Sequence, residues 1–517
     1  MAYRIVVPFI ALLMISACAG PPQTAPSATS VPSPSSSQTA ASTTSPGPGE
    51  QQAQPVLAET RSTLTPELKV EVVGLNRVKS KHLVIQVRLS NTGAEERLSW
   101  TGQMGDNTRP LGRIRWASGI GVLDTEAHAL ILPYKPADFP CLCTDQDRDG
   151  LGYFIDPGES ISLYAVTPAP SGNPASTTVV TPVGPPMPNV PISDEPPAVP
   201  PGMLIPDPDA EPVTTVIRSL VTPSESLDQY EETADDGKNL QVSLSSDVLF
   251  AVNKATLTPK ANAILTNTAE LIDSSTGATV KVEGHADSSG TDAINDPLSE
   301  RRAQAVQRAL SELVNRQDVD FQAKGYGSRR PLYGNDTDEG KRRNRRVTVS
   351  FARPQPAATD QAATPSPSPT PGAEELTGTG KADGQPISME VTGLRRLPGG
   401  LGLLTYRITN DGDREAWFNE LHGARDWMSF KYRAAFNVTL TDVEAGRQYL
   451  PGRLQVPTGD DIDSYCACTD LSGVRLSSPK FGPGEAKEFW DLFALPAGAT
   501  ALNVKIASFR ELTVPVQ

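Results

Sequence analysis

Three low-complexity stretches constrain how this chain can fold, because their composition cannot supply a hydrophobic core. Residues 18–62 are mainly Ala, Pro, Ser, Thr, Gln and Gly, residues 195–238 are rich in Pro and acidic residues, and residues 354–384 contain a Pro-Ser-Pro-Ser-Pro-Thr-Pro run. Segments of this kind are typical of disordered linkers and tethers. They predict three folded units of ordinary domain size, at residues 63–194, 239–353 and 385–517.

The N-terminal residues predict export and a lipid anchor. The apolar run Ile5–Ile15 is too short to span a bilayer. It leads into Ile15-Ser16-Ala17-Cys18, which resembles a bacterial lipobox. The resemblance implies removal of a signal peptide, residues 1–17, and attachment of diacylglycerol and an acyl chain such as palmitate at Cys18. Each buried methylene contributes about 0.8 kcal/mol, so these chains would hold the protein in a membrane. The alternative is an ordinary signal peptide cut near Ala17.

Composition limits the functions that fit such a chain. The net charge of −14 lies partly in the low-complexity stretches, so it indicates solubility more than a partner. The four histidines leave little scope for a histidine-based site, and no Ser-His-Asp set or phosphate loop is apparent. The basic run at 341–346 could be read as a nucleic-acid patch. In an exported protein it fits an anionic glycan or a solvated face better, so the sequence predicts neither an enzyme nor a nucleic-acid partner.

Four short blocks near the middle of the chain are the most specific motif of the sequence. An Asp and an Arg fifteen residues apart would by themselves be surface charges or a weak salt bridge. In order, residue type and spacing, the blocks resemble the peptidoglycan-binding domain of the OmpA-like family, which occurs in outer-membrane protein A and in peptidoglycan-associated lipoproteins. They are Gly284-His285-Ala286-Asp287 with Gly290, Asn295, Leu298-Ser299 with Arg302-Ala303, and Asn344-Arg345-Arg346-Val347.

The resemblance implies a ligand and a set of contacts. The family binds the diaminopimelate of the peptidoglycan stem peptide, which offers an ammonium and a carboxylate on one carbon. Asp287 would accept from the ammonium, and Arg302 would grip the carboxylate with its planar guanidinium. Neighbouring Arg301 is the less favoured candidate by spacing, and His285 would support the loop. The other positions that match the family around the cleft are Asn295, Leu298, Asn344 and Arg345.

Residue patterns in the same segment agree with a small α+β domain. Residues 259–272 have apolar positions at helical spacing, and Asp296-Pro297 is typical of a helix start, with Asp as the N-cap. Asn253, where the family often has Asp, is expected in a turn. The predicted order is β-α-β-α-β-β, with two helices on one face of a small mixed sheet. The predicted strands cover residues 242–250, 279–283, 321–325 and 346–351.

The first and third units look like copies of each other. Both carry a Cys-x-Cys-Thr-Asp block, a Pro-Gly-Glu block and an Asn/Gly turn in the same order. Strand-like runs at 83–89 and 401–408 with Gly and Pro punctuation predict an all-β, immunoglobulin-like sandwich for each copy. The matching blocks are Cys141–Asp145 with Cys466–Asp470, and Pro157–Glu159 with Pro483–Glu485.

Four of the five cysteines remain once Cys18 is lipidated, two in each copy. An oxidising compartment favours disulfides. Because each copy has its own pair, we expect Cys141–Cys143 and Cys466–Cys468, with a link between the copies as the alternative. A disulfide across one residue closes a small ring and is more easily reduced than most, which leaves a redox role open.

An acidic segment of the first copy matches the ligand spacing of a calcium loop. Gly150 would permit its turn, but Gly152 stands where such loops have an aliphatic residue, and the second copy keeps only Asp470. Calcium is therefore the weaker hypothesis, and an acidic solvated loop is the default. No other cofactor is expected. The carboxylates concerned are Asp145, Asp147, Asp149 and Asp156.

Together these patterns predict a cell-envelope lipoprotein that binds peptidoglycan non-covalently and ties a membrane to the wall. That membrane would be an outer membrane, with the protein facing the periplasm, or the outer leaflet of a single-membrane cell. Two alternatives remain open. One is an adhesin or receptor whose β-domains bind an envelope or host partner, with the middle domain as a mount. The other is a thiol–disulfide redox protein that uses the Cys-x-Cys pairs.

Overall fold

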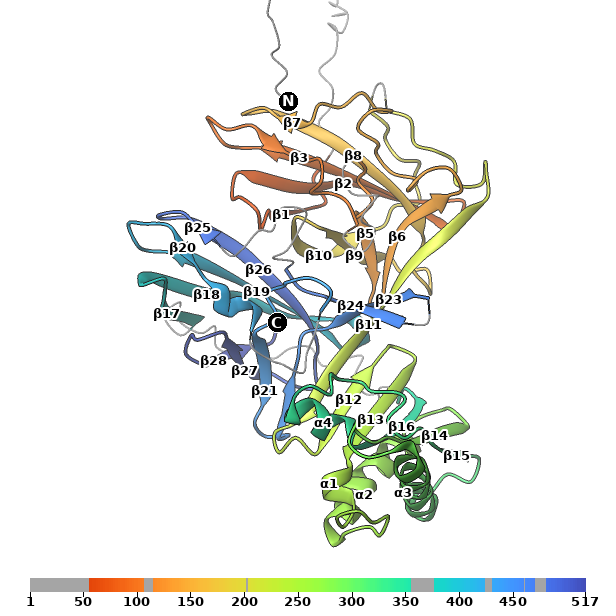
Figure 1. Cartoon of the computed structure of the whole chain (residues 1–517). Coiled ribbons are helices and arrows are strands. Elements are labelled where there is room, and N and C mark those ends of the chain that lie inside the picture. Colours follow the sequence, from red (N-terminus) through yellow and green to blue (C-terminus); the bar gives the residue numbers. More distant parts are fainter. Residues whose placement is uncertain are drawn as a thin grey trace, which may run out of the picture. The chain divides into compact units, whose positions relative to one another are not determined.

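The computed structural model describes residues 55–106, 115–200, 203–354, 376–423, 430–459, 461–469 and 480–517 (Figure 1). The predicted signal peptide, the lipidation site Cys18 and Asp470 lie outside the described residues. None of the helices in the described part of the chain is long and apolar enough to cross a membrane.

The first copy consists of two antiparallel sheets that share one core. Val72 and Ile85 from one sheet and Val122 and Val179 from the other are all fully buried in the same cluster. One sheet has the order β1-β2-β3-β8 and the other continues as β10-β9-β5-β6. Their strands are β1 (Ala58–Arg61), β2 (Leu68–Val78), β3 (His82–Asn91), β8 (Ser160–Pro168), β10 (Gly184–Pro191), β9 (Ser176–Thr181), β5 (Gly121–Asp124) and β6 (Ala129–Pro136), with the short pair β4 (Leu98–Ser99) and β7 (Phe154–Ile155).

The second copy repeats this plan. Its first sheet has the order β17-β18-β19-β26, and β22-β21-β27-β28 lie in the other sheet. The register of the first hairpin shifts at Val391/Gly393, as it does at Val72/Gly74 in the first copy. The strands are β17 (Thr377–Ala382), β18 (Gln385–Leu397), β19 (Leu401–Asn410), β26 (Ala486–Ala494), β21 (Val438–Asp442), β22 (Arg447–Tyr449), β27 (Ala501–Ile506) and β28 (Leu512–Pro515), with β20 (Ala416–Trp417), β23 (Arg453–Thr458), β24 (Asp461–Cys466), β25 (Lys480–Phe481), η3 (Pro398–Gly400) and η4 (Asn419–His422).

A buried asparagine fixes the same turn in both copies. The side-chain amide of Asn91 donates to the carbonyls of Glu96 and Ile155, while its oxygen accepts from Gly93. Asn410 likewise donates to Arg414 and Phe481 and accepts from Gly412. Equal strand order, an equal bulge and an equal buried asparagine support the duplication read from the sequence. The immunoglobulin-like class of these sheets stays a prediction.

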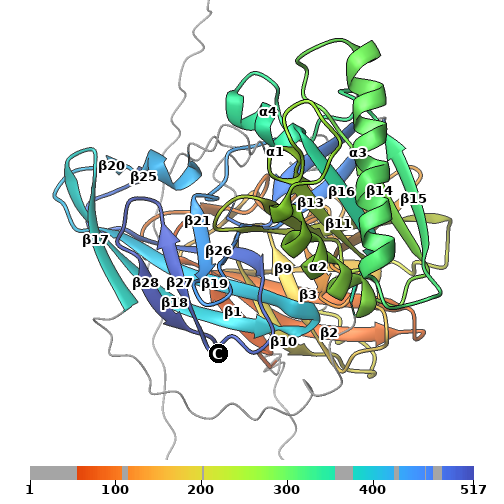
Figure 2. The ribbon, with the colours of Figure 1, turned by 90° about the horizontal axis from the view of Figure 1, so that it is seen from below.

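The middle region is a mixed sheet with two long helices on one face, as predicted (Figure 2). Two short helices, α1 and α4, were not predicted. Strands β14 and β15 are parallel, and the remaining pairs in the order β12-β13-β16-β14-β15 are antiparallel. Val280 and Val282 of β14 pack with Leu265 and Leu310 of the two helices in one buried cluster. The elements are β13 (Asn239–Ser245), α1 (Ser246–Leu249), α2 (Pro259–Asp273), β14 (Thr279–Gly284), α3 (Asp292–Leu313), β15 (Asp320–Gly325), α4 (Asp338–Asn344) and β16 (Arg346–Ala352).

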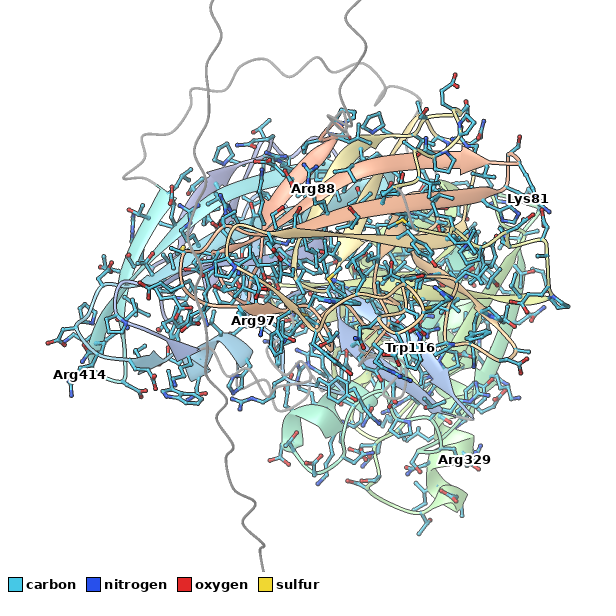
Figure 3. The ribbon with its side chains drawn as sticks, turned by 90° about the horizontal axis from the view of Figure 1, so that it is seen from above. Lys81, Arg88, Arg97, Trp116, Arg329 and Arg414 are labelled. Atoms are coloured by element: carbon cyan, nitrogen blue, oxygen red, sulfur yellow. A yellow bond between two sulfur atoms is a disulfide. The ribbon has the colours of Figure 1, made fainter. Side chains whose placement is uncertain are left out.

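The predicted start of the second helix is wrong. Helix α3 begins at Asp292, because the backbone amides of Ile294 and Asn295 already donate to the carbonyl of Thr291. Pro297 lies inside the helix, where its missing N–H costs one backbone hydrogen bond. Asp296 is consequently no N-cap, and its carboxylate instead forms an ion pair with the exposed Arg329 (Figure 3).

The predicted linker at 195–238 is also wrong over part of its length. It contains β11 (Val213–Ser226) and β12 (Glu231–Asp235). The composition of 195–238 as a whole is dominated by proline and acidic residues. The run Val213–Ser226 within it is rich in β-branched residues, which favour a strand, and this run did not change the average. Two more strands begin inside predicted linkers, since β1 starts at Ala58 within 18–62 and β17 starts at Thr377 within 354–384.

We expect Arg343→Ala to lower the free energy of unfolding by about 3–5 kcal/mol, because removing one partner leaves buried carboxylates without a counter-charge. Arg343, 9% exposed, binds Glu225 of β11 at 2.8 Å, Glu232 of β12 at 3.3 Å and Glu339 at 2.6 Å. Urea unfolding of the purified chain measures the change.

The matched control is Arg342→Ala. Arg342 is adjacent and also binds Glu339, but it is more exposed, so its loss should cost about 0–1 kcal/mol. Equal effects of the two substitutions would show that β11 and β12 are not held by a buried ion pair.

Candidate functional site

Asp287 lies in the loop that follows β14, and its carboxylate is held from two sides. One oxygen accepts from the backbone amide of Ser289 at 2.8 Å, and the other binds the guanidinium of Arg345 at 2.7 Å. The side chain is 6% exposed. Gly284 allows the loop to begin so close to α3, since a Cβ there would meet the carbonyl oxygen of Ser299 at 2.1 Å.

Arg302 lies on α3, and among the described residues only one nitrogen of its guanidinium donates a hydrogen bond. Its Nε donates to the carbonyl of Lys254 at 3.1 Å, and the guanidinium lies 5.1 Å from the centre of the Phe250 ring. Among the described residues, no group accepts a hydrogen bond from its two terminal nitrogens. Burial is the main cause that lowers the pKa of Arg302, with nearby Arg345 acting the same way and Asp247 opposing. The neighbouring Arg301 is exposed.

Arg345 connects the two halves of the site. It binds Asp247 of α1 through Nε at 3.0 Å and a terminal nitrogen at 2.7 Å, and its other terminal nitrogen binds Asp287. The hydrogen bond to Asp247 contributes most to the raised pKa of Arg345, and the bond to Asp287 adds to it. Two carboxylates and two guanidiniums thus gather here with no net charge.

The two asparagines predicted at the site hold its loops. Asn295 donates to the carbonyl of Ser289 at 2.9 Å. Asn344, fully buried, accepts from the backbone of Tyr333 and donates to Asn335, whose side-chain oxygen also accepts from Ser288. These bonds fix the backbone at Asp287 and directly after it. Leu298 is half-buried on α3, and Asn253 takes the turn conformation expected of it, with φ of 57°.

His285 is structural. Its ring stacks on Tyr326 with 5.6 Å between the centroids and is 3% exposed. Burial, with nearby Arg346 and Arg330, lowers the pKa of His285 to about 3. The side chain is therefore neutral at pH 7 and has no charge to offer a ligand, in agreement with its predicted supporting role.

Three residues that the sequence reading did not single out complete the arrangement. Asp247 anchors Arg345, Phe250 supports Arg302, and Asn335 joins the two loops. The sequence carried no direct signal for the ion pair, because Asp247 and Arg345 are 98 residues apart.

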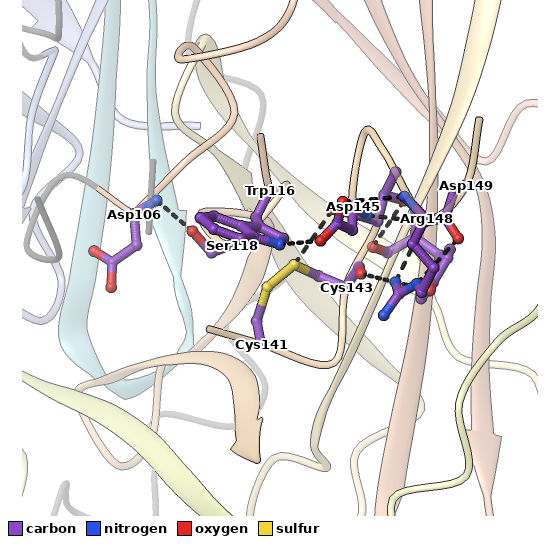
Figure 4. The surroundings of a disulfide bond; sticks show 10 residues. Asp106, Trp116, Ser118, Cys141, Cys143, Asp145, Arg148 and Asp149 are labelled. Atoms are coloured by element: carbon purple, nitrogen blue, oxygen red, sulfur yellow. Dashed lines mark hydrogen bonds and ion pairs between the residues drawn. A yellow bond between two sulfur atoms is a disulfide. The ribbon is translucent and has the colours of Figure 1, made fainter. Parts of the chain in front are cut away.

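The acidic segment of the first copy forms a loop closed by the chain's own donors (Figure 4). One oxygen of Asp145 accepts from the amides of Asp147 and Arg148, and the other from the indole of Trp116. Asp149 accepts from the amide of Asp145. Asp147 and Asp156 form ion pairs with Arg115 and Arg97. The four carboxylates therefore have partners in separate directions, which fits the acidic-loop reading better than a calcium site.

Each copy has its own pair of bonded cysteines. The structure joins Cys141 to Cys143 and Cys466 to Cys468, with Cα–Cα distances of 5.3 and 5.2 Å. In both copies the second cysteine lies opposite the strand that follows the Pro-Gly-Glu block, with bridges from Cys143 to Ala165 and from Cys468 to Asp491. This is the pairing favoured from the sequence.

Two helices on a mixed sheet, with a neutral Asp–Arg cluster after β14 and on α3, define a small α+β domain with a candidate ligand site. Residues 249–345 match the model of the OmpA family. A lipoprotein of Pseudomonas aeruginosa, "Outer-membrane lipoprotein YfiB", is 33% identical over 122 residues, which are 24% of this chain and 71% of that protein. The chain belongs to the OmpA family, as the sequence motifs predicted.

Other similarities are confined to the same region. "Outer membrane porin F" of Pseudomonas aeruginosa is 40% identical over 106 residues, 20% of this chain and 30% of the relative. The chain thus spans about a third of the length of the porin F proteins that it matches. Among solved structures, the OmpA-like domain of FopA1 from Francisella tularensis is 29% identical, covering 24% of this chain and 79% of that one, with a TM-score of 0.20.

We expect stability to fall between about pH 6.5 and 5 because of His285. Its pKa is lower in the folded chain than in the unfolded one, so the unfolded state takes up the proton first as pH falls. This favours unfolding by about 1.4 kcal/mol per pH unit. Urea unfolding at pH 7 and pH 5 measures the loss, and His285→Phe, which keeps a ring against Tyr326, should reduce it. An unchanged pH dependence in this variant would contradict the assignment.

Proposed function

We propose that this chain is a cell-envelope lipoprotein that binds peptidoglycan without a covalent link and tethers a membrane to the wall. The observation that supports it most is the pairing of a held carboxylate, Asp287, with the unused terminal nitrogens of Arg302 in one small domain. One relative named as an outer-membrane lipoprotein and one named as a probable lipoprotein support an envelope location and a lipid anchor.

The chemistry of the site suits one end of a diaminopimelate residue. Arg302 offers two N–H donors for a carboxylate, and a planar guanidinium grips such a group bidentately. Asp287 uses one bond per oxygen, so lone pairs remain to accept from an ammonium. Because the cluster is already neutral, a zwitterion adds no net charge to it. A ligand with a carboxylate alone would leave a buried imbalance.

The supporting contacts keep the site formed before a ligand binds. Arg345 is held by Asp247 and orients the Asp287 carboxylate, while Asn295 and Asn344 fix the loops. Groups ordered in advance cost less to immobilise when a ligand binds. Arg345, Asn295 and Asn344 are therefore positioning residues in this proposal, and Leu298 offers an apolar surface beside Arg302.

We expect Asp287→Ala and Arg302→Ala each to weaken binding to sacculi by about 2 kcal/mol or more, because each leaves one buried charge of the ligand or the site without a partner. Cosedimentation of the soluble chain with diaminopimelate-containing sacculi measures it. Arg302→Lys should also bind weakly, since a lysine keeps the charge but not the fork.

Arg301→Ala is the matched control, because Arg301 is the exposed neighbour on the same helix. It should bind like the original chain. Equal losses at positions 301 and 302 would indicate a general attraction of positive charge to the wall, and no binding by the original chain would overturn the proposed ligand.

We expect Cys18→Ala to move the protein from the membrane fraction to the soluble fraction of the envelope, because lipid on this thiol is the proposed anchor. Metabolic labelling with a fatty acid should mark the original chain and not the variant. A labelled variant, or a variant that stays in the membrane, would argue against the anchor at this residue. Sacculus binding should be unchanged in both proteins.

A further inference from the structure

Asp491 is a fully buried carboxyl group beside the disulfide of the second copy. It lies on β26, with its backbone bridged to Cys468 and a relative exposure of 0%. One carboxyl oxygen and the sulfur atoms of Cys466 and Cys468 lie within 4.8 Å of one another. The acid is therefore the carboxyl group beside both sulfurs, close enough for a small side-chain movement to bring it within hydrogen-bond distance of one of them.

The surroundings of Asp491 favour its uncharged form. The hydroxyl of Tyr406 on β19 interacts with the carboxyl group, although neither group has a hydrogen-bond partner of ordinary geometry among the described residues. Burial raises the pKa of Asp491 well above its ordinary value, and the interaction with Tyr406 opposes this rise. Burial therefore favours the protonated acid at this place.

The first copy lacks this acid although it has the same disulfide. Ala165 stands opposite Cys143 where Asp491 stands opposite Cys468, and the same alignment of strands puts Val87 at the position of Tyr406. The first copy shows that this disulfide can form in the fold without a buried acid beside it. Burying polar groups costs free energy, and the first copy forms the same strands with apolar residues at both positions, so Asp491 indicates a role in the second copy beyond folding.

The second disulfide is also the more accessible one. Cys141 and Cys143 are 1% and 0% exposed, whereas Cys466 is half-buried. Both Cys466 and Cys468 line a cavity of about 110 Å³, together with Leu454, Tyr465 and Trp490. A reacting sulfur must be reached by a partner thiolate. The cavity lining is mainly apolar and aromatic but also includes Asp106 and Arg218, so it suits a peptide that offers both apolar and polar groups.

We propose that Cys466–Cys468 is a redox-active disulfide that oxidises a protein dithiol, with Asp491 as the proton donor to Cys468. A thiolate of the substrate attacks Cys466, the bond between the two sulfurs breaks, and Cys468 leaves with the proton of Asp491. The second substrate thiol gives its proton to Asp491 and attacks the mixed disulfide, and Cys466 leaves as a thiolate. Cys466 then takes a proton from water, which balances the proton that the first substrate thiol lost to water when it became a thiolate. The substrate becomes a disulfide, and Cys466 and Cys468 become two thiols. This activity goes beyond the wall-binding function and differs from the non-enzymatic role expected from composition.

The two disulfides of one molecule provide the test. The soluble chain is incubated with a reduced peptide that carries two cysteines, free thiols are alkylated at intervals, and mass spectrometry quantifies each pair. We expect Cys466–Cys468 to react about a hundredfold faster than Cys141–Cys143, the lower end of what a positioned acid contributes. The peptide should lose two hydrogens for each pair of thiols that forms.

Asp491→Asn, which keeps shape but not the acid, should remove most of that difference and flatten the dependence of the rate on pH. It should leave the reactivity of Cys141–Cys143 and the binding to sacculi unchanged, so a failure here is distinguishable from a failure of the wall anchor. Equal rates for the two pairs in the original chain, which need no variant to fold, would overturn the proposal. So would a folded Asp491→Asn variant that reacts at the original rate.

Discussion

Strand β11 is the constraint on which the arrangement of the sheets depends. Its backbone is hydrogen-bonded to four strands, β6, β12, β22 and β23, and it contributes Leu220 to an apolar cluster with residues of the second copy. An edge strand with free N–H and C=O groups invites unwanted pairing, and β11 covers such edges on β6 and β23. Glu225 near its end then requires a counter-charge, which Arg343 of α4 supplies.

That counter-charge lies next to the candidate site. Arg343 precedes Asn344 and Arg345, so the helix that fixes the loops of the site is itself fixed by β11 and β12. The site in turn depends on Arg345 binding Asp247 and Asp287 together. A buried ion pair gains little net stability, but it strongly favours one geometry over others that would leave a charge alone. The local consequence is an Asp287 carboxylate with a defined orientation.

The sequence predicted the parts of this protein that depend on local pattern. Helix α2 follows from the apolar spacing of 259–272, and β14 follows from the alternation of 279–283. The assignment of Asp287 and Arg302 to a ligand site stays a prediction. The prediction of a helix start at Asp296 was wrong. Asp-Pro is a good helix start in isolation, but the carbonyl of Thr291 already accepts the first hydrogen bonds of α3 about one turn earlier. Local pattern is reliable only where no neighbouring turn competes for the same hydrogen bonds.

Features that depend on distant pairing could not be predicted in this way. Asp247 meets Arg345 across 98 residues, and β11 becomes a strand because β6 and β23 offer it hydrogen bonds. In the low-complexity segment, the prolines of 195–212 dominated the composition, and the short β-branched run after them carried too little weight. The average composition of a long segment is a good guide to its solubility. Whether a strand forms depends instead on the few residues whose backbones can bond to a neighbouring strand.

The two copies differ in features that the shared fold does not require. They share strand order, a bulge and a buried asparagine, so those features are what the fold requires. Both copies also contain a Cys-x-Cys disulfide. In the second copy Asp491 lies opposite Cys468, and in the first copy Ala165 lies opposite Cys143. A position that is apolar in one copy and acidic in the other is not needed for folding. Burying one acid costs free energy, and the otherwise apolar core of the second copy can offset that cost. Burial also favours the protonated form of the acid, so Asp491 can supply a proton to a neighbouring sulfur.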